Sequence, residues 1–562
     1  MNSSPGSYVT ERDLSQRVRA VSTSIGAIVG ASKKGPIMET TLVTNEQEFI
    51  EMFGPPDWRF SLMHYAALEF LKKSSRLMVT RVVNDDLSRG AVPLTAGAFY
   101  SVDSSSAIEP RPTLSVFDDG SSNALGIDDP YNTYSFNPNQ AGIENVLFFV
   151  CACNPGDWNN RIYIEVRPAY KAGLSEFDEN YDDPYSFWID VYMDYDNPRD
   201  HPVESYLVKR SRETNGFGNQ MFLEDVINKS SKYIRVRNNE FAPEKVKVVE
   251  TAKVFLEGGT NGGRVSYGQV MRGWDLYSDT EHINVNILIQ GGAPIGMTAL
   301  QDVADIQRKM LTIAEDRMDA VAILDVPSSE QETARAVAYS TQTLNVDSSY
   351  GALYTCDMRV PDTYNDMDVW VPPSGFVAAN CAMTDEDYEV WFSPAGMYRG
   401  RIEGANKSKY IYNQGHRDAL DAANVNAIRY FPKGQGWRVW GSNTLQSMAS
   451  ALSDLNVRRL MNFIEKSVRL ANMYSVFDPN DQILRSRVTT IIERFLTPIK
   501  NAGGLYWFKV VCDDSNNTPE TIMAGVLVID AYFDPVITAK RIHLRANLMA
   551  TGAEFKTYLT NK

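Results

Sequence analysis

The sequence has few cysteines, and those it has do not suggest a disulfide framework. It contains five in 562 residues, an odd and sparse number that favours free buried thiols in a reducing compartment. Cys151 and Cys153 form a single C-x-C motif. No second pair and no nearby histidine completes the four ligands that tetrahedral zinc requires. The cysteines therefore predict neither disulfides nor a metal site.

Long apolar runs and an excess of positive charge are also missing. No run reaches the roughly 18 apolar residues of a membrane-spanning helix, and the start MNSSPGSYVTERD lacks the basic and apolar regions of a signal peptide. The formal net charge is −15, whereas surfaces that bind phosphate backbones are rich in lysine and arginine. We therefore expect no membrane insertion, no secretion signal and no direct contact with nucleic acid.

Residue types that often carry catalysis are present but are not arranged for it. Ser393 lies in FSPAG rather than G-x-S-x-G, and Pro394 lacks the backbone N–H that an oxyanion hole would use there. The five histidines show no H-E-x-x-H pairing. DYDNPRD resembles the start of a calcium loop, but Arg199 stands where an EF-hand needs glycine. We therefore predict no catalytic residue, no cofactor and no metal.

The sequence does contain clear α/β patterns, and its length predicts about three or four domains. VNILIQGG and AVAILDVP are typical of buried strands, and between them Val303, Ile306, Met310 and Ile313 recur at helical spacing. This predicts a βαβ unit with parallel strands. A switch point in such a sheet is a place for a ligand, but the nearby LEGGTNGG lacks the features of a phosphate-binding loop and is better explained as a turn.

The composition changes between Gly97 and Ala141. Serine, aspartate, asparagine, proline and glycine dominate there, and helical periodicity disappears. We interpret this segment as a small, exposed, mostly β insertion.

The C-terminal part is rich in strand patterns. YWFKVVCDDSNNTPE combines an apolar strand with a thiol and two carboxylates, but it has no visible base or metal partner. Its turn-forming residues predict a connection between two strands of one sheet. Further on, Ile542, Leu544 and Leu548 alternate with polar residues, which predicts a half-buried strand near the chain end.

One helix pattern, LNVRRLMNFIEKSVRLA, has an apolar stripe and a mainly basic one. The basic stripe contains Arg459, Lys466 and Arg469. In an acidic protein this face is a candidate electrostatic contact. A merely solvated helix face explains it equally well, because charged outer faces are common.

Several ordered motifs resemble the contractile-tail sheath proteins of myoviruses. In the last third they are WVPPSG, Cys381-Ala-Met-Thr-Asp385, WFSPAGMYRG, NVRRL, GGLYWFKVVCDDSNNTPE and TGAEF. Near the start, SPGSYVTE and TLVTNEQEFIEMFG are similar to that family's N-terminus, and VMRGWDLYSD is similar to its middle. The insertion between Gly97 and Ala141 shows no such similarity.

The resemblance implies a structural, non-enzymatic subunit that forms stacked rings, expected to be hexameric, around an inner tail tube. It implies a contractile phage tail, assembled in the host cytoplasm, with tube, baseplate and tail terminator proteins as partners. It also implies that both chain ends, through Tyr8, Val9, Ile542, Leu544 and Leu548, add strands to neighbouring subunits. From its charge, we predict that the basic stripe faces the tube. The alternatives are a type VI secretion or R-type pyocin sheath and, more distantly, a hydrolase on the βαβ domain.

The expected fold is a multidomain α/β and α+β protein. The expected segments are an N-terminal arm (1–20), middle α/β domains (21–95 and 146–389), an inserted outer β domain (96–145), an inner tube-facing polymerisation domain (390–540) and a C-terminal strand and arm (541–562).

Overall fold

The computed structural model describes residues 22–84, 97–102, 108–112, 146–169, 185–193, 201–214, 218, 220–245 and 253–541. The chain divides into two compact units, Met1–Asp478 and Pro479–Lys562. The residues expected to form the arm strands, Tyr8, Val9, Ile542, Leu544 and Leu548, lie outside the described part.

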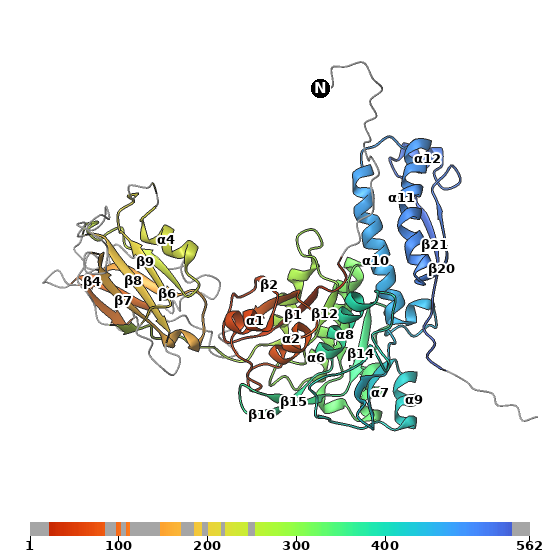
Figure 1. Cartoon of the computed structure of the whole chain (residues 1–562), viewed down its shortest axis with the longest axis horizontal. Helices are drawn as coiled ribbons and strands as arrows, with labels where there is room; N and C mark the ends of the chain where they lie inside the picture. The colour runs from red at the N-terminus through yellow and green to blue at the C-terminus, as the bar shows by residue number, and fades with distance from the viewer. Residues whose placement is uncertain are drawn as a thin grey trace, which may run out of the picture. The chain divides into compact units, whose positions relative to one another are not determined.

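An eight-stranded sheet organises the first unit (Figure 1). Its order is β19-β18-β14-β13-β12-β1-β3-β2. The six strands from β18 to β3 are mutually parallel, and the outermost strands β19 and β2 pair antiparallel. The strands are β1 (Gly26–Ala31), β2 (Thr40–Val43), β3 (Leu77–Val82), β12 (Ile287–Ile289), β13 (Val321–Asp325), β14 (Gly351–Thr355), β18 (Val425–Phe431) and β19 (Gly436–Val439).

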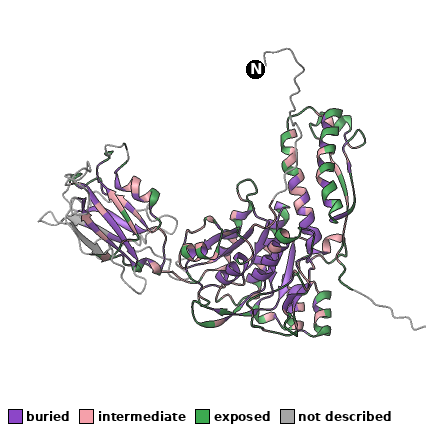
Figure 2. Cartoon of the chain, viewed as in Figure 1, coloured by how far each residue is buried: buried purple, intermediate pink, exposed green. Residues whose placement is uncertain are grey.

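Helices cover both faces of this sheet, as buried parallel strands require. Successive side chains of β13 alternate between two separate apolar cores: Ile323 belongs to one, whereas Ala322 and Leu324 belong to the other. Figure 2 shows the buried strands and the exposed outer faces of the helices. The helices are α1 (Glu46–Phe53), α2 (Met63–Leu71), α5 (Tyr267–Asp275), α6 (Leu300–Arg317), α7 (Thr333–Ala338), α8 (Ser374–Asp387), α9 (Gln414–Ala422) and α10 (Leu455–Asn472).

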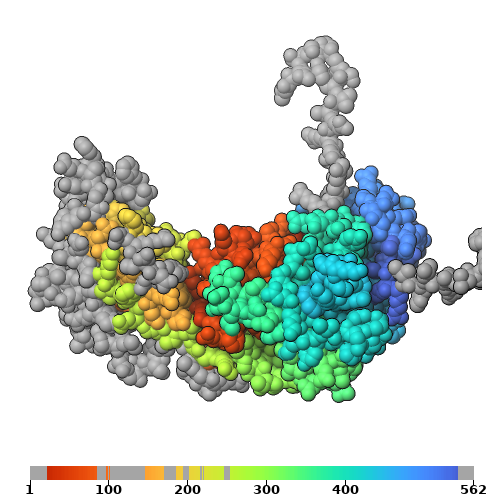
Figure 3. All heavy atoms as spheres, turned by 60° about the horizontal axis from the view of Figure 1, so that its bottom comes forward, coloured from red at the N-terminus to blue at the C-terminus, as the bar shows by residue number. Residues whose placement is uncertain are grey.

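The expected βαβ unit is confirmed as β12, α6 and β13, with the two strands parallel. A small sheet, β16-β15-β17, extends the first core; its strands are β15 (Met358–Asp362), β16 (Met367–Val371) and β17 (Lys407–Ser408). In Figure 3 the red residues of the first strands adjoin green and teal residues from much later in the chain. Segments distant in sequence thus build one α/β layer structure.

Two further sheets of four strands share a third apolar core that includes residues of both. Their orders are β10-β6-β4-β5 and β11-β7-β8-β9. This is a β-sandwich. Its elements are β4 (Gly97–Val102), β5 (Ile108–Pro112), β6 (Val146–Ala152), β7 (Ile162–Pro168), β8 (Phe187–Met193), β9 (Glu204–Val208), α4 (Leu223–Ser230), β10 (Ile234–Asn238) and β11 (Val254–Phe255).

The structure corrects two expected domain boundaries. The insertion does not end at residue 145, because β6 to β11, expected in the middle domain, pair with β4 or share its core. The inner domain does not begin at 390, because β18 and β19 complete the eight-stranded sheet. Each segment joins the sheet that offers it unpaired backbone groups, and sequence adjacency does not reveal which sheet that is.

The second unit is built on a helix and a strand hairpin. Helix α11 (Gln482–Asn501) buries Val488, Ile492 and Leu496. Strands β20 (Leu505–Val511) and β21 (Asp530–Pro535) pair antiparallel. The connection between them contains the short helix α12 (Pro519–Met523).

Candidate functional site

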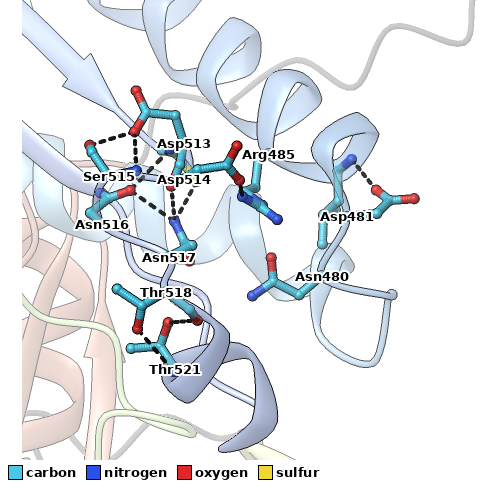
Figure 4. Close-up of polar contacts among 12 residues, drawn as sticks. Asn480, Asp481, Arg485, Asp513, Asp514, Ser515, Asn516, Asn517, Thr518 and Thr521 are labelled. Carbon is cyan, nitrogen blue, oxygen red and sulfur yellow. Dashed lines mark hydrogen bonds and ion pairs between the residues drawn. The ribbon is translucent and has the colours of Figure 1, made fainter.

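The connection after β20 is held together by its own polar side chains (Figure 4). The carboxylate of Asp513 accepts hydrogen bonds from the backbone N–H of Ser515 at 2.8 Å and from its hydroxyl at 2.5 Å. These bonds lower the pKa of Asp513. Asn516 accepts from the backbone N–H of Asp513 at 3.0 Å and donates to the carboxylate of Asp530 at 3.0 Å. These contacts fix the loop to the start of β21.

Two more residues form polar contacts that hold this loop in place. Asn517 is buried and exchanges a pair of 2.9 Å hydrogen bonds with the backbone of Val528. Arg485 of α11 donates to Asp514 at 2.5 Å. The polar residues of the loop are therefore used to position the two strands. The prediction that this stretch connects two strands of one sheet is confirmed.

The β20–β21 hairpin carries large exposed aromatic side chains. Tyr506 is 64% exposed, Trp507 49% and Tyr532 55%. In the described part of the second unit the sheet has only these two strands, so each has an edge of backbone groups without a strand partner there. Exposed apolar surface and open strand edges are both features of surfaces that bind another polypeptide.

The helix α10 does not present the basic stripe that the sequence suggested. Arg459 and Asp385 of α8 form a buried ion pair at 2.5 Å, with side chains 3% and 6% exposed. Burial raises the pKa of Asp385 and the charge of Arg459 opposes that rise. The expectation of an exposed Arg459 is therefore wrong, because its guanidinium neutralises a carboxylate inside the first unit.

Lys466 is engaged in a similar way. Its ammonium group binds Asp319 at 2.6 Å and Asn284 at 2.6 Å, and Asp319 in turn binds Arg317 at 2.9 Å. Burial lowers the pKa of Lys466, although the charge of Asp319 acts against this. Of the three residues of the stripe, only Arg469 is exposed.

A buried polar network that the sequence analysis did not identify lies where β12 and β13 end. The carboxylate of Asp325 accepts from the backbone N–H of Gly292 at 3.0 Å and from the N–H and hydroxyl of Ser374 at 2.7 and 2.6 Å. Ser374 is the first residue of α8. Asp325 thus ties the end of one strand to the start of a helix 49 residues later. The only sequence signal is an acidic residue directly after a buried apolar run.

Burial raises the pKa of Asp325 to about 7, against the lowering effect of its bonds to Ser374. The folded chain therefore holds this proton more tightly than the unfolded chain, whose carboxyl titrates near 3.8. We expect the stability that Asp325 contributes to be greatest below pH about 4 and to fall as pH rises to about 7. Asp325→Asn should remove this dependence.

Thermal unfolding of wild type and Asp325→Asn across that pH range compares how steeply the unfolding temperature changes with pH. A loss of stability in the variant that is the same at every pH does not affect this comparison. Asp387→Asn, at the exposed C-terminal end of α8, is the matched control and should keep the wild-type slope. Parallel curves for wild type and Asp325→Asn would contradict the expectation.

The other residues considered as catalytic or metal-binding candidates have structural surroundings. Ser393 is buried and its hydroxyl accepts from the backbone N–H of Ala395 at 3.3 Å. Among the residues that the structure describes, no group of three or more histidines, cysteines and acidic residues is placed to hold a metal. None of the helices within the described ranges is long and apolar enough to cross a membrane.

Comparison with known proteins gives two family matches along the chain. Residues 284–445 match the phage tail sheath protein central domain, and residues 447–549 match the phage tail sheath C-terminal domain. The tail sheath protein of Enterobacteria phage T4 is 24% identical over 662 aligned positions, covering 98% of each chain. That of Vibrio phage KVP40 is 25% identical over 674 positions, covering 98% of this chain and 99% of the relative.

Solved structures show the same fold. A sheath tail protein from Listeria innocua has a TM-score of 0.56 at 11% identity, covering 93% of this chain and 94% of that one. One from Desulfitobacterium hafniense has a TM-score of 0.53 at 12% identity, covering 95% and 96%. The mixed α/β arrangement is therefore a tail sheath fold.

The fold and the sequence matches together define a structural subunit of contractile tails rather than an enzyme. The chain belongs to the phage tail sheath protein family. It is a contractile tail sheath subunit and part of the virion tail.

Proposed function

We propose that this subunit assembles as stacked hexameric rings around an inner tail tube and contracts to drive the tube through the host envelope. The tube, baseplate and tail terminator proteins are its proposed partners. Contraction is a change between two packings of the subunits. It uses the free energy difference between the two lattices, and needs no nucleotide.

The observation that supports this assembly is the β20–β21 hairpin. An isolated two-stranded sheet is marginally stable in water, and three or more strands with an apolar face are the usual requirement for independent stability. Helix α11 covers part of this hairpin, but its edges are open in the described residues and Tyr506, Trp507 and Tyr532 are exposed. Strands added by the ends of neighbouring chains would satisfy both needs through main-chain hydrogen bonds.

The remaining surfaces follow from this arrangement. We place the β-sandwich, residues 97–255, on the outside of the sheath, because it has a complete core of its own and needs no neighbour to bury apolar surface. A tube contact from α10 would rest on Arg469 at its C-terminal end, since Arg459 and Lys466 are paired within the subunit.

Electron microscopy of the purified chain tests the proposal. We expect tubes or stacked rings in negative stain, and we expect gold-labelled antibody against this chain to decorate the tails of virions. Compact single particles at all concentrations would contradict polymerisation. Labelled tubes without attached capsids would favour the sheath of a secretion system or an R-type pyocin over a phage tail.

A further inference from the structure

A cavity of about 220 Å³ opens where the strand order of the main sheet reverses. From β1 the chain proceeds to β3 on one side, and from β12 it proceeds to β13, β14 and β18 on the other. The cavity is lined by residues 29–31 at the end of β1 and by residues 290–292 at the end of β12. Carboxyl ends of adjacent parallel strands at such a point are where open α/β sheets usually bind ligands.

The base of the cavity offers an unused hydrogen-bond donor. Gln290 is only 5% exposed and lines the cavity. Its Oε1 accepts from the backbone N–H of Asp325 at 2.7 Å and from Nε2 of Gln307 at 2.8 Å. The backbone donor fixes which side-chain atom of Gln290 is the oxygen. Its amide nitrogen donates no hydrogen bond to any residue in the described part of the chain, and is left for a ligand that accepts one.

The lining also contains two arginines, Arg59 and Arg264. Neither guanidinium forms a salt bridge with a described residue. Asp57 is near Arg59 and accepts from its backbone N–H, but its carboxylate binds Lys33 at 2.7 Å. None of the described residues that line the cavity is acidic. In a chain of net charge −15, two arginines at one cavity that form no ion pair with described residues indicate a site for negative charge.

The rest of the lining is apolar. Trp274 of α5 and Ile306 of α6 contribute to it, together with Val29 and Val270. A cavity with an apolar wall and a few polar groups is typical of sites for small organic molecules. Its volume lies below the roughly 300–1,000 Å³ of most ligand pockets, so it would hold only a small molecule. Arg264 reaches it from residues 262–265, which follow the β-sandwich in the chain.

We propose that this cavity binds a small organic anion. The carboxylate or phosphate group of the anion is held by Arg59, Arg264 and the amide nitrogen of Gln290, and its apolar part packs against Trp274 and Ile306. The ligand would connect the end of β1, residues 262–265 and the loop after β12. Because it binds only the folded chain, it should also raise the unfolding temperature.

Titration of the full-length protein with benzoate, phenyl phosphate and neutral benzamide tests the proposal, with binding followed by ligand-observed NMR and by thermal shift. We expect at least one of the two anions to bind, and benzamide to bind at least about tenfold more weakly, because benzamide lacks the negative charge that the two guanidinium groups attract. The stronger of the two anions identifies whether the natural ligand carries a carboxylate or a phosphate.

Arg264→Gln should weaken binding of the anion about tenfold or more. The unfolding temperature without ligand should stay near that of wild type, because Arg264 is exposed. Arg335→Gln removes another exposed arginine that does not line the cavity, and should leave binding unchanged. The proposal is overturned if neither anion binds, if benzamide binds as well as benzoate, or if Arg264→Gln and Arg335→Gln have equal effects. Any of these results would leave the cavity a mere apolar crevice.

Discussion

Deletion of residues 1–20, or of residues 541–562, is expected to abolish polymerisation while leaving the first unit folded. The reason is that the three apolar cores of that unit are built from residues between Ala27 and Leu455, so neither deletion removes a core side chain. The β20–β21 hairpin, in contrast, would lose the strands proposed to complete its sheet. Sedimentation velocity should show monomers in place of polymers, and the main thermal transition should stay within a few degrees of wild type.

The control for these truncations is an insertion that leaves both ends intact. A short Gly-Ser segment after Gly434 suits this purpose, because Gly434 lies in the β18–β19 turn with positive φ, and a Cβ atom at this position would have no neighbouring atoms within 4 Å. This variant should polymerise. Normal tubes from either truncation would show that the chain ends do not hold the lattice together.

The α/β core was predictable because its strands are buried on both faces. VNILIQGG and AVAILDVP are continuous apolar runs, and the helix between them has one apolar side. The three elements of the βαβ unit follow one another closely in sequence, so the local pattern alone predicts β12, α6 and β13. The same reasoning identified the β20–β21 connection, whose turn-forming residues lie directly after an apolar strand.

The extent of the β-sandwich was not predictable in this way. Strands β6, β7 and β8 have apolar runs as strong as those of the main sheet, and their partners are chosen by long-range pairing: β6 pairs with β10 and β4, and β7 with β8 and β11. Period and composition predict that a strand exists. They carry no information about which of several sheets it joins.

The prediction of an exposed basic stripe on α10 was wrong for a related reason. The partners of Arg459 and Lys466 lie 74 and 147 residues away in the sequence. A helix in which Leu455 to Leu460 are all buried has no solvated side at its start, so its polar residues must find buried partners. Charged residues along a helix therefore indicate an exposed face only where the helix is packed against the protein on one side.

Arg459→Glu is expected to destabilise the first unit severely. The change removes the cation that neutralises Asp385 and places a second carboxylate in a buried position. Breaking a buried ion pair costs about 3–5 kcal/mol because the remaining charge is left unpaired in a poorly polar environment, and the added like charge increases that cost. Chemical and thermal unfolding should show the loss, and the soluble yield should fall. Arg469→Glu makes the same charge change on the exposed end of α10 and should cost about 1 kcal/mol or less.

A double variant separates the ion pair from a general sensitivity of α10. Replacing both partners, Asp385→Leu with Arg459→Leu, removes the pair without leaving either charge buried alone, and such replacements are often neutral or stabilising. The double variant should therefore be more stable than either single leucine variant, a coupling that a double-mutant cycle measures directly. If instead Arg459→Glu folds with wild-type stability but its sheaths fail to remain extended on tubes, Arg459 faces the tube in the assembled tail and the ion pair with Asp385 is not its role.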